Sequence, residues 1–297
     1  MNFLFKKQTM IIIIIIALLS VGSFSFYLYQ KNKTTTLLLE LEMARIADLT
    51  PKQEIIGSSI EKRNIEAFTF GNGEKHLLFV GGIHGGYEWN TSLLAYEMMD
   101  YLEANPNTIP NNVKVTIIPV LNPDGLNKTV GTSSNFKSTD VPPTIAETIS
   151  GRFNANKVDL NRNFDCNWKS TGIWQNKTVD PGSKAFSEPE SQAIRNYIDV
   201  QKPQAVVVWY SSAGGIYTSN CNGTVLTETK TLAKIFAEAS KYPNQGEFTS
   251  YEINGDMVNW LAKENIPAIS VLLTDHTNTE KNKNQAGLEA VLKHYSN

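Results

Sequence analysis

The sequence predicts one α/β domain with a mixed, mostly parallel twisted sheet that is flanked by helices on both faces. Two observations predict this class. Short apolar runs that end in glycine or polar residues alternate with longer stretches of helical spacing, which is typical of strands joined by helices. Once the apolar N-terminus is set aside, about 245 residues remain, enough for a single large domain with a buried core.

The strands are expected as one hairpin followed by four buried strands. Residues 55–59 and 64–70 have the length and alternation of a hairpin. The buried strands are short apolar runs, as expected for parallel strands that are covered on both faces: 76–82, 113–120, 204–210 and 268–273. The helices have apolar residues three and four positions apart: 91–102, 188–200, 229–239, 256–264 and 285–294.

The N-terminus is an uncharged run at residues 9–29, which includes six consecutive isoleucines at 11–16. As a helix it spans about 30 Å, the thickness of a bilayer core. Lys6 and Lys7 precede it, and positive charge favours the cytoplasmic side of a membrane. We therefore expect a single-pass membrane protein with its domain on the extracytoplasmic side.

This expectation divides the chain into four segments: a cytoplasmic N-terminus at 1–8, a transmembrane anchor or signal segment at 9–29, a stalk or linker at 30–53 and the domain at 54–297. A secretory signal is the alternative to an anchor, because small residues follow the apolar run, and its cleavage would give a secreted domain. In either exported form, Cys166 and Cys221 can pair as one disulfide, and two buried free thiols are the other possibility.

Charge and loop composition restrict the function. The net charge of -2 indicates no basic field, so we expect no nucleic-acid partner. Polar and glycine-rich residues follow the predicted strands, and ligands bind at the carboxyl ends of strands in open α/β sheets. The site is therefore expected in four loops: 83–90, 121–125, 211–215 and 274–278.

Two residue pairs in or near these loops carry chemistry. His84 and Glu88 follow a glycine-rich turn, and imidazole nitrogen and carboxylate oxygen both suit zinc, although a loop histidine and a capping glutamate would look similar. Asn161 and Arg162 follow Arg152, and a guanidinium matches a carboxylate with two parallel hydrogen bonds.

Taken in order, these residues resemble the M14 (carboxypeptidase A-like) zinc metallocarboxypeptidases, over about residues 54–294. The resemblance rests on His84 and Glu88, the NPDG turn at 122–125, Asn161 with Arg162, the strand and turn at 206–215, Tyr251 with Gly255 and Trp260, and the strand at 267–273. It implies a zinc carboxypeptidase-like fold and a hydrolase, a protease that removes residues from peptide C-termini with one zinc ion.

The resemblance also implies roles for individual residues. His84 and Glu88 match the first two zinc ligands, with three residues between them where the family commonly has two. Arg152 resembles the arginine that polarises the scissile carbonyl, and such a donor contributes about 3 kcal/mol to catalysis. Asn161 and Arg162 resemble the pair that binds the terminal carboxylate of the substrate.

Two more positions concern the substrate. Tyr251 resembles the mobile tyrosine that closes over the bound peptide, and Val258 matches the floor of the pocket for the terminal side chain. An apolar floor indicates an apolar or aromatic side chain. The neighbouring Asp256 would instead select a basic side chain, or it caps the helix that begins there, and we favour the cap.

The pattern departs from the family at two positions. We expect Ser211 at the third zinc ligand, where a neutral hydroxyl is a poor ligand, and Leu272 at the general base, where leucine cannot take a proton. Asp275 and His276 lie just beyond that strand, and they would have to replace the base or the ligand for catalysis to survive.

Two functions follow from these observations. The first is a metallocarboxypeptidase-like protein that acts on peptide C-termini outside the cytoplasm, with impaired or lost catalysis. The second is a pseudoenzyme, a non-catalytic membrane-anchored module that binds the carboxylates of peptides or of peptidoglycan (cell-wall stem) peptides.

Overall fold

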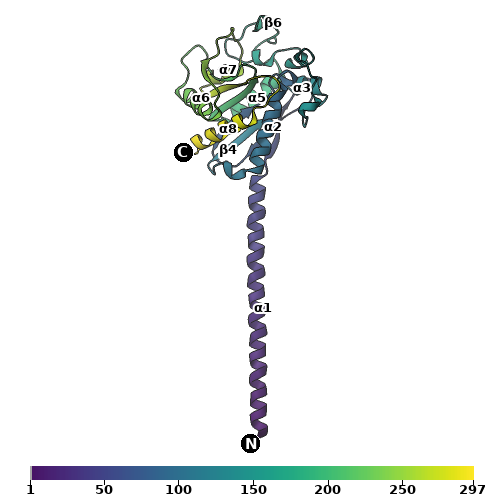
Figure 1. The fold of residues 1–297 in the computed structure, drawn as a ribbon, viewed down its shortest axis with the longest axis vertical. Helices are drawn as coiled ribbons and strands as arrows, with labels where there is room; N and C mark the ends of the chain where they lie inside the picture. Colours follow the sequence, from purple (N-terminus) through teal and green to yellow (C-terminus); the bar gives the residue numbers. More distant parts are fainter. Residues whose placement is uncertain (1) are drawn as a thin grey trace. The chain divides into compact units, whose positions relative to one another are not determined.

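The computed structural model describes residues 2–297, except that in the helix α1 (Asn2–Leu49) only the side chains of residues 10 and 18–40 are described. The chain divides into two units, Met1–Thr50 and Pro51–Asn297 (Figure 1). The predicted anchor at 9–29 lies within α1 and includes residues 9 and 11–17, whose side chains fall outside the described part. Across the described residues, no helix is both long and apolar enough to span a bilayer.

The second unit is built on a mixed eight-stranded sheet in the order β1-β2-β4-β3-β7-β10-β8-β9. Its four central strands, β4, β3, β7 and β10, run parallel, while the β1–β2 hairpin and the β10–β8 pair are antiparallel. The strands are β1 (Lys52–Ser58), β2 (Asn64–Phe70), β3 (Lys75–Val80), β4 (Val113–Ile118), β7 (Ala205–Ser211), β8 (Gly215–Thr218), β9 (Asn244–Glu247) and β10 (Ala268–Leu273). The predicted mixed α/β sheet is confirmed.

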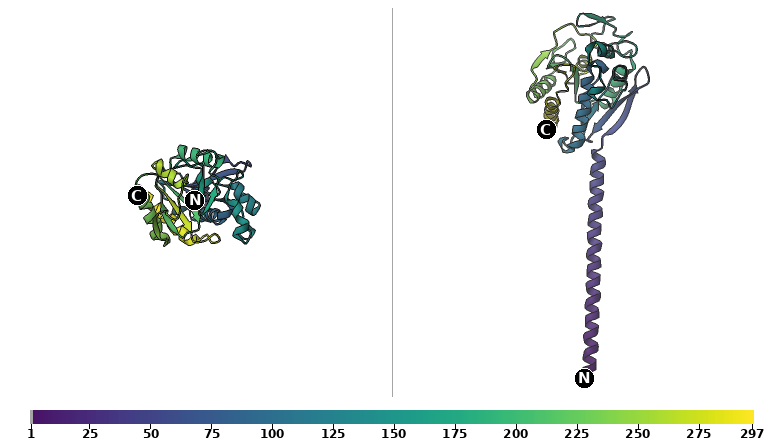
Figure 2. Two further views of the ribbon diagram at one scale, coloured as in Figure 1. Left: turned by 90° about the horizontal axis from the view of Figure 1, so that it is seen from above. Right: turned by 45° about the vertical axis from the view of Figure 1, so that its right-hand side comes forward.

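Helices cover both faces of this sheet (Figure 2). On one face, α2, α6 and α8 pack against alternate strand residues such as Val207 and Trp209. On the other face, α5 and α7 pack against the intervening strand residues, such as Val206 and Val208, whose side chains point to the opposite side of the sheet. These helices are α2 (Trp89–Ala104), α5 (Pro189–Gln201), α6 (Thr227–Ser240), α7 (Met257–Lys263) and α8 (Lys281–Tyr295).

Some elements have no counterpart among the predicted ones. The turn predicted at 121–125 continues into α3 (Pro123–Val130), because the Asn122 side chain accepts a hydrogen bond from the Gly125 amide and proline suits the first helical position. A separate hairpin is formed by β5 (Gly172–Trp174) and β6 (Lys177–Val179). The remaining helical segments are α4 (Ile145–Thr148), η1 (Gly85–Glu88), η2 (Pro106–Thr108), η3 (Ser138–Asp140), η4 (Ile149–Arg152) and η5 (Leu160–Arg162).

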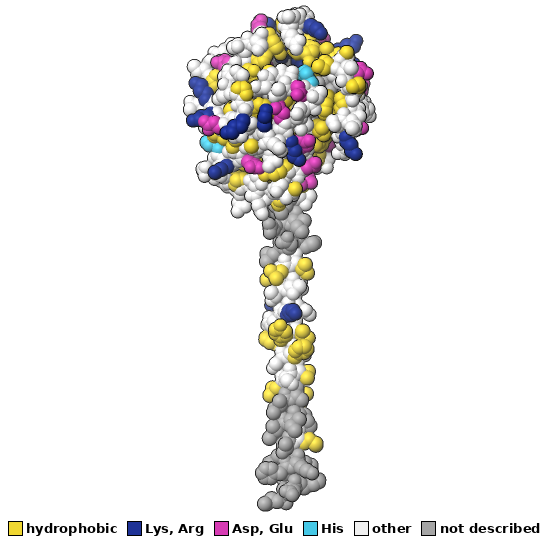
Figure 3. Space-filling view, viewed as in Figure 1, with side chains coloured by type: hydrophobic (Ala, Val, Ile, Leu, Met, Phe, Trp, Pro, Cys, Tyr) yellow, Lys and Arg dark blue, Asp and Glu magenta, His cyan; other side chains and the backbone are white. Residues whose placement is uncertain are grey.

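The two cysteines form a disulfide, with 5.9 Å between the Cα atoms of Cys166 and Cys221. It joins the segment that follows η5 to the loop that follows β8. On the face of the domain shown in Figure 3, acidic and basic side chains are interspersed, in keeping with the small net charge.

One carboxyl group, that of Glu190 in α5, is buried away from the site. It accepts hydrogen bonds from the Ile60 amide at 3.3 Å and from the Asn154 side chain at 3.2 Å. Burial raises the pKa of Glu190 from 4.5 to about 7, because the ionised form loses its hydration. The folded state therefore binds this proton more tightly than the unfolded state does. The protonated carboxyl group of Glu190 therefore contributes to the free energy of unfolding. This contribution is complete below about pH 4.5 and is lost as the pH rises through 7.

Glu190→Gln changes the free energy of unfolding, and we expect this change to be more favourable at pH 8 than at pH 4. The difference should be on the order of 3 kcal/mol. Urea unfolding of both proteins across this pH range measures the difference. The exposed Glu103→Gln variant is the control and should run parallel to the wild type. Parallel curves for Glu190→Gln as well would contradict the prediction.

Candidate active site

A cavity of about 440 Å³ lies at the carboxyl ends of the central strands, in the second unit. The nine residues to which the family resemblance assigned a role or a site position all line this cavity: His84, Glu88, Arg152, Asn161, Arg162, Ser211, Tyr251, Val258 and Leu272. The structure thus brings together residues that are far apart in the sequence. The role of each has to be argued from its contacts.

The turn after β3 places His84 and Glu88. Gly82 adopts a positive φ of 63°, and a Cβ atom there would lie 2.4 Å from the Ser92 hydroxyl, so the turn requires glycine. Thr91 closes the turn, because its hydroxyl donates to the Glu88 carbonyl at 2.8 Å and accepts from the Gly82 amide at 3.0 Å. His84, which precedes η1, and Glu88, its last residue, are thereby fixed at the two ends of this short helix.

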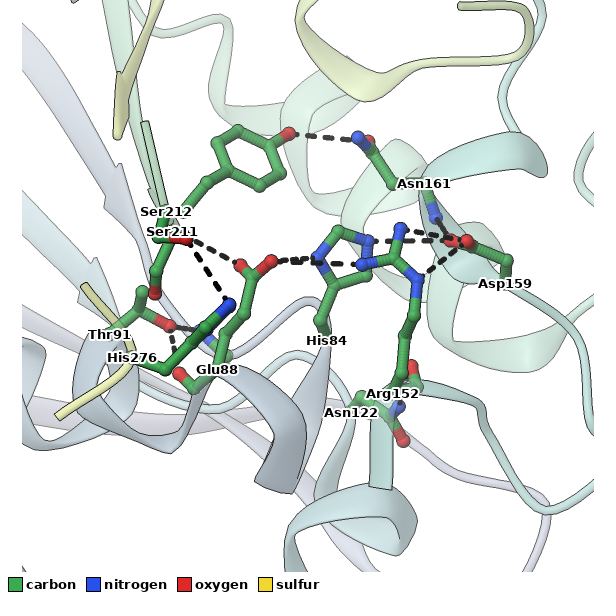
Figure 4. A network of polar contacts seen from close by, with 12 residues as sticks. His84, Glu88, Thr91, Asn122, Arg152, Asp159, Asn161, Ser211, Ser212 and His276 are labelled. Atoms are coloured by element: carbon green, nitrogen blue, oxygen red, sulfur yellow. Dashed lines mark hydrogen bonds and ion pairs between the residues drawn. The ribbon is translucent and has the colours of Figure 1, made fainter. Parts of the chain in front are cut away.

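Both ring nitrogens of His84 face carboxylates (Figure 4). Nδ1 lies 2.9 Å from Glu88 Oε1, and Nε2 lies 3.3 Å from Asp159 Oδ1. All three side chains are buried. The two residues proposed as metal ligands therefore converge, and they contact each other directly.

Arg152 is held by Asp159. Its Nε and Nη2 atoms lie 2.9 and 2.8 Å from Asp159 Oδ2, and its Nη1 lies 3.7 Å from Glu88 Oε1. Its guanidinium also lies over the Trp174 ring, 4.2 Å from the centroid. Burial alone would raise the pKa of Asp159, but the charge of Arg152 and the contact with His84 outweigh it and hold that pKa below its usual range. Asp159 is therefore ionised in the folded protein.

Arg162 is held by main-chain carbonyl groups. Its Nε and Nη2 donate to the carbonyl of Ile173 in β5, at 3.0 and 2.8 Å, and Nη1 donates to the carbonyl of Asn161 at 2.6 Å. A guanidinium has five N–H groups, so two remain beyond these three bonds. The Arg162 guanidinium also lies over the Tyr251 ring, 6.0 Å from its centroid.

The amide of Asn161 is occupied within the protein. Its nitrogen donates to Asp256 Oδ2 at 2.8 Å, and its oxygen accepts from the Tyr210 hydroxyl at 3.2 Å and the Met257 amide at 3.1 Å. Burial raises the pKa of Tyr210 well above its usual value, so this hydroxyl stays protonated. Tyr210 was not among the predicted site residues, although it directly precedes Ser211.

The pocket beside Tyr251 is more polar than Val258 alone indicated. Asn220, Glu247, Asp256, Asn259 and Ser270 line the same cavity. Asp256 caps α7, because its Oδ1 accepts from the Asn259 amide at 3.0 Å, and the favoured capping interpretation is confirmed. Gly255 (φ 62°) brings this cap against the backbone of Arg162, since a Cβ there would lie 2.2 Å from the Arg162 carbonyl oxygen. The cavity is therefore lined by polar and charged side chains as well as by Val258.

Ser211 contributes its backbone to the site rather than its side chain. Its amide donates to Glu88 Oε2 at 3.1 Å, whereas its hydroxyl donates to the buried Asn90 in α2 at 2.8 Å. Leu272 lines the cavity and brings no proton acceptor.

The two neighbouring groups have different contacts, and His276 lines the cavity. The Asp275 carboxylate accepts from the Thr277 and Asn278 amides of its own loop, both at 2.7 Å. His276 packs on Tyr87 at 4.5 Å between centroids and lies 3.3 Å from the Ser212 hydroxyl. In the part of the chain that the structure describes, no three His, Cys, Asp or Glu side chains gather into a set that could hold a metal. A catalytic zinc site uses three protein ligands, so the donors present do not fit it.

Asp159 and Trp174 were also absent from the residues singled out in the sequence. Asp159 stands two residues before Asn161 in the same motif, so its position was a usable signal. Trp174 lies in a short hairpin whose strands are too brief to be recognised by alternation.

Comparison with known proteins gives a consistent result. The sequence model of Peptidase_M14, described as zinc carboxypeptidase, matches residues 39–285. Metallocarboxypeptidase A of Arthroderma otae is 30% identical over 233 residues, which cover 69% of this chain and 53% of that protein. The gamma-D-glutamyl-L-diamino acid endopeptidase 1 of Lysinibacillus sphaericus is 26% identical over 216 residues, 66% of this chain and 54% of that protein. The chain spans about half the length of these curated relatives.

Solved structures share the fold. The carboxypeptidase A from Helicoverpa armigera has a TM-score of 0.65 at 20% identity, over 86% of this chain and 69% of the other. The murein-tripeptide amidase MpaA from Escherichia coli O157 has a TM-score of 0.59 at 22% identity, over 84% of this chain and 95% of the other.

The contacts of Asp159 lead to a stability prediction. Asp159→Asn leaves the Arg152 guanidinium buried without its carboxylate and should cost about 3–5 kcal/mol of unfolding free energy in urea denaturation. Asp165→Asn is the control, since it removes only the exposed pair with Lys263 and should cost less than about 1 kcal/mol. Equal losses of unfolding free energy in the two variants would show that the buried pair of Asp159 and Arg152 stabilises the domain no more than an exposed pair does.

Proposed function

The chain belongs to the zinc carboxypeptidase (peptidase M14) family, and we propose that it binds the free carboxylate at the end of a peptide without hydrolysing that peptide. The observation that carries the proposal is the arrangement of Arg162. Three of its N–H groups are held by carbonyl oxygens, and the guanidinium lines a cavity that contains no proton acceptor at Leu272. Charge-assisted bonds from a fixed guanidinium suit a carboxylate.

The same contacts support the loss of catalysis. Hydrolysis in this family needs a metal to activate water and a base to take its proton. His84 and Glu88 are the two ligand candidates, Ser211 turns its hydroxyl to Asn90, and leucine at 272 accepts no proton. Arg152 is held by Asp159 through Nε and Nη2, and this pairing fixes one side of the site.

The polar pocket supports a class of ligand. Glu247 and Asp256 bring carboxyl groups, and Asn220 and Asn259 bring amides, to the cavity that the guanidinium of Arg162 also lines. Such a lining suits a terminal residue whose side chain carries an amino group. Two similar proteins are named for a diamino acid and for a murein tripeptide. We therefore propose that the ligand is a cell-wall stem peptide that ends in a diamino acid.

Isothermal titration calorimetry with L-Ala-γ-D-Glu-diaminopimelate tests this function. The tripeptide should bind roughly tenfold or more tightly than its C-terminal amide, since losing charge-assisted hydrogen bonds costs about 1.5–3 kcal/mol. Arg162→Gln should remove the preference for the free acid, while the control Arg195→Gln, outside the cavity, should keep it. Equal binding of acid and amide, or release of the terminal residue detected by mass spectrometry, would contradict the proposal.

We also propose that the domain works outside the cytoplasm, held at the membrane by residues 9–29. The apolar run and its preceding lysines support this location, as do the exposed side chains of Leu18, Leu19 and Val21 and the disulfide.

The location has its own test. The full chain should remain in the membrane pellet after alkaline carbonate extraction, and externally added protease should degrade its domain in spheroplasts. Recovery in the supernatant with an intact N-terminus would contradict the anchor. N-terminal sequencing distinguishes the secreted form, which would begin beyond the apolar run.

A further inference from the structure

We infer that Tyr210, rather than Ser211, occupies the position at which strand β7 would supply a third metal ligand. Its phenol then holds the two halves of the site together in place of a metal. The inference deepens the proposed function and rests on it, since it explains how the carboxylate-binding residues stay in position without zinc. It also names the residue at which metal binding was lost.

The side chains of β7 alternate between the two faces of the sheet. Val207 and Trp209 belong to the layer covered by α2, α6 and α8. Val206, Val208 and Tyr210 belong to the layer covered by α5 and α7. Because successive side chains of a strand point to opposite faces, Ser211 shares the face of Trp209. Its hydroxyl is accordingly bonded to Asn90 in α2.

The site lies on the other face. Leu160, which precedes the Asn161–Arg162 pair, and Val258 of the side-chain pocket both pack in the layer that contains Tyr210. Only a residue of β7 with the orientation of Tyr210 can therefore point into the site. A ligand placed at 211 would have to leave its own face of the sheet.

The adjacent strand gives independent support. In the parallel pairing of β10 with β7, Leu272 lies opposite Tyr210. Leu272 also packs against the layer of Tyr210, whereas its neighbours Val271 and Leu273 belong to the opposite layer. The expected base position and the expected third-ligand position are thus cross-strand neighbours on one face, and leucine and tyrosine now fill them.

The contacts of Tyr210 show what it does there. Its ring packs on His84, with 5.8 Å between centroids, and its hydroxyl reaches Asn161 Oδ1 at 3.2 Å. It therefore joins the half of the site that carries His84 to the half that carries Asn161 and Arg162. Glu88 completes the closure, since its Oε1 lies 2.9 Å from His84 Nδ1 and its Oε2 accepts from the Ser211 amide.

Zinc content tests the inference. Purified full-length wild type, Tyr210→His and Ser211→His are each dialysed against zinc chloride and then buffer, and zinc is measured by inductively coupled plasma mass spectrometry. We expect about one zinc per chain in Tyr210→His and less than about 0.1 in the other two, because only the former completes three ligands. Cobalt(II) should give the visible d–d absorption of a tetrahedral site in Tyr210→His alone.

Three results would overturn the inference: stoichiometric zinc in the wild type, zinc in Ser211→His, or a folded Tyr210→His without zinc. Circular dichroism and thermal melting establish folding. If Tyr210→His does not fold, Tyr210→Phe decides, because it keeps the ring but loses the bond to Asn161. It should bind no zinc and should bind the tripeptide roughly three- to tenfold more weakly. Unchanged tripeptide binding in Tyr210→Phe would overturn the joining role.

The two proposals fail in different ways. Absence of tripeptide binding by the wild type, in the presence of a chelator, would refute the proposed function and leave the zinc result standing. Zinc bound to the wild type would refute the present inference, whatever the binding of the tripeptide.

Discussion

The site depends on the buried carboxylate of Asp159. One of its oxygens faces His84 Nε2 and accepts from the backbone N–H of Asn161, and the other accepts from Nε and Nη2 of Arg152. A buried anion is tolerated only when cations and donors surround it, so these residues are fixed with respect to one another before any ligand arrives. The carboxylate-binding half and the histidine half of the site are consequently one rigid arrangement.

A second constraint is the register of the sheet. The parallel pairing of β7 and β10 decides which side chains enter the cleft together, and it selects Tyr210 and Leu272. Tyr210 is buried in one apolar layer and the half-buried Leu272 packs against the same layer, so the floor of the cleft continues the hydrophobic core. Chemistry that needs a charged pair at this floor would oppose the packing that now stabilises it.

Much of this architecture follows from local sequence. The apolar runs at 113–120, 204–210 and 268–273 predicted the central strands, and they are present because strands buried on both faces require such runs. Strands β8 and β9 escaped prediction because they are four residues long and contain glycine. The motif also located His84, Glu88 and Arg162 in one cavity. It did not distinguish Ser211 from Tyr210, because a shift of one residue moves a side chain to the opposite face. The polar pocket depends on Asn220, in the loop after β8, and on Glu247, at the end of β9, and neither residue belongs to a local sequence pattern.

The hairpin β5–β6 carries a consequence for how this family member tolerates sequence change. Its hold on Arg162 is made by the carbonyl oxygen of Ile173, a main-chain atom that every amino acid supplies. A substitution of Ile173 therefore leaves the two hydrogen bonds from the Arg162 guanidinium in place. An insertion or deletion of one residue would move a different carbonyl into register and release it. Substitutions at this position therefore leave the hydrogen bonds to Arg162 intact, whereas a change in the length of the hairpin removes them.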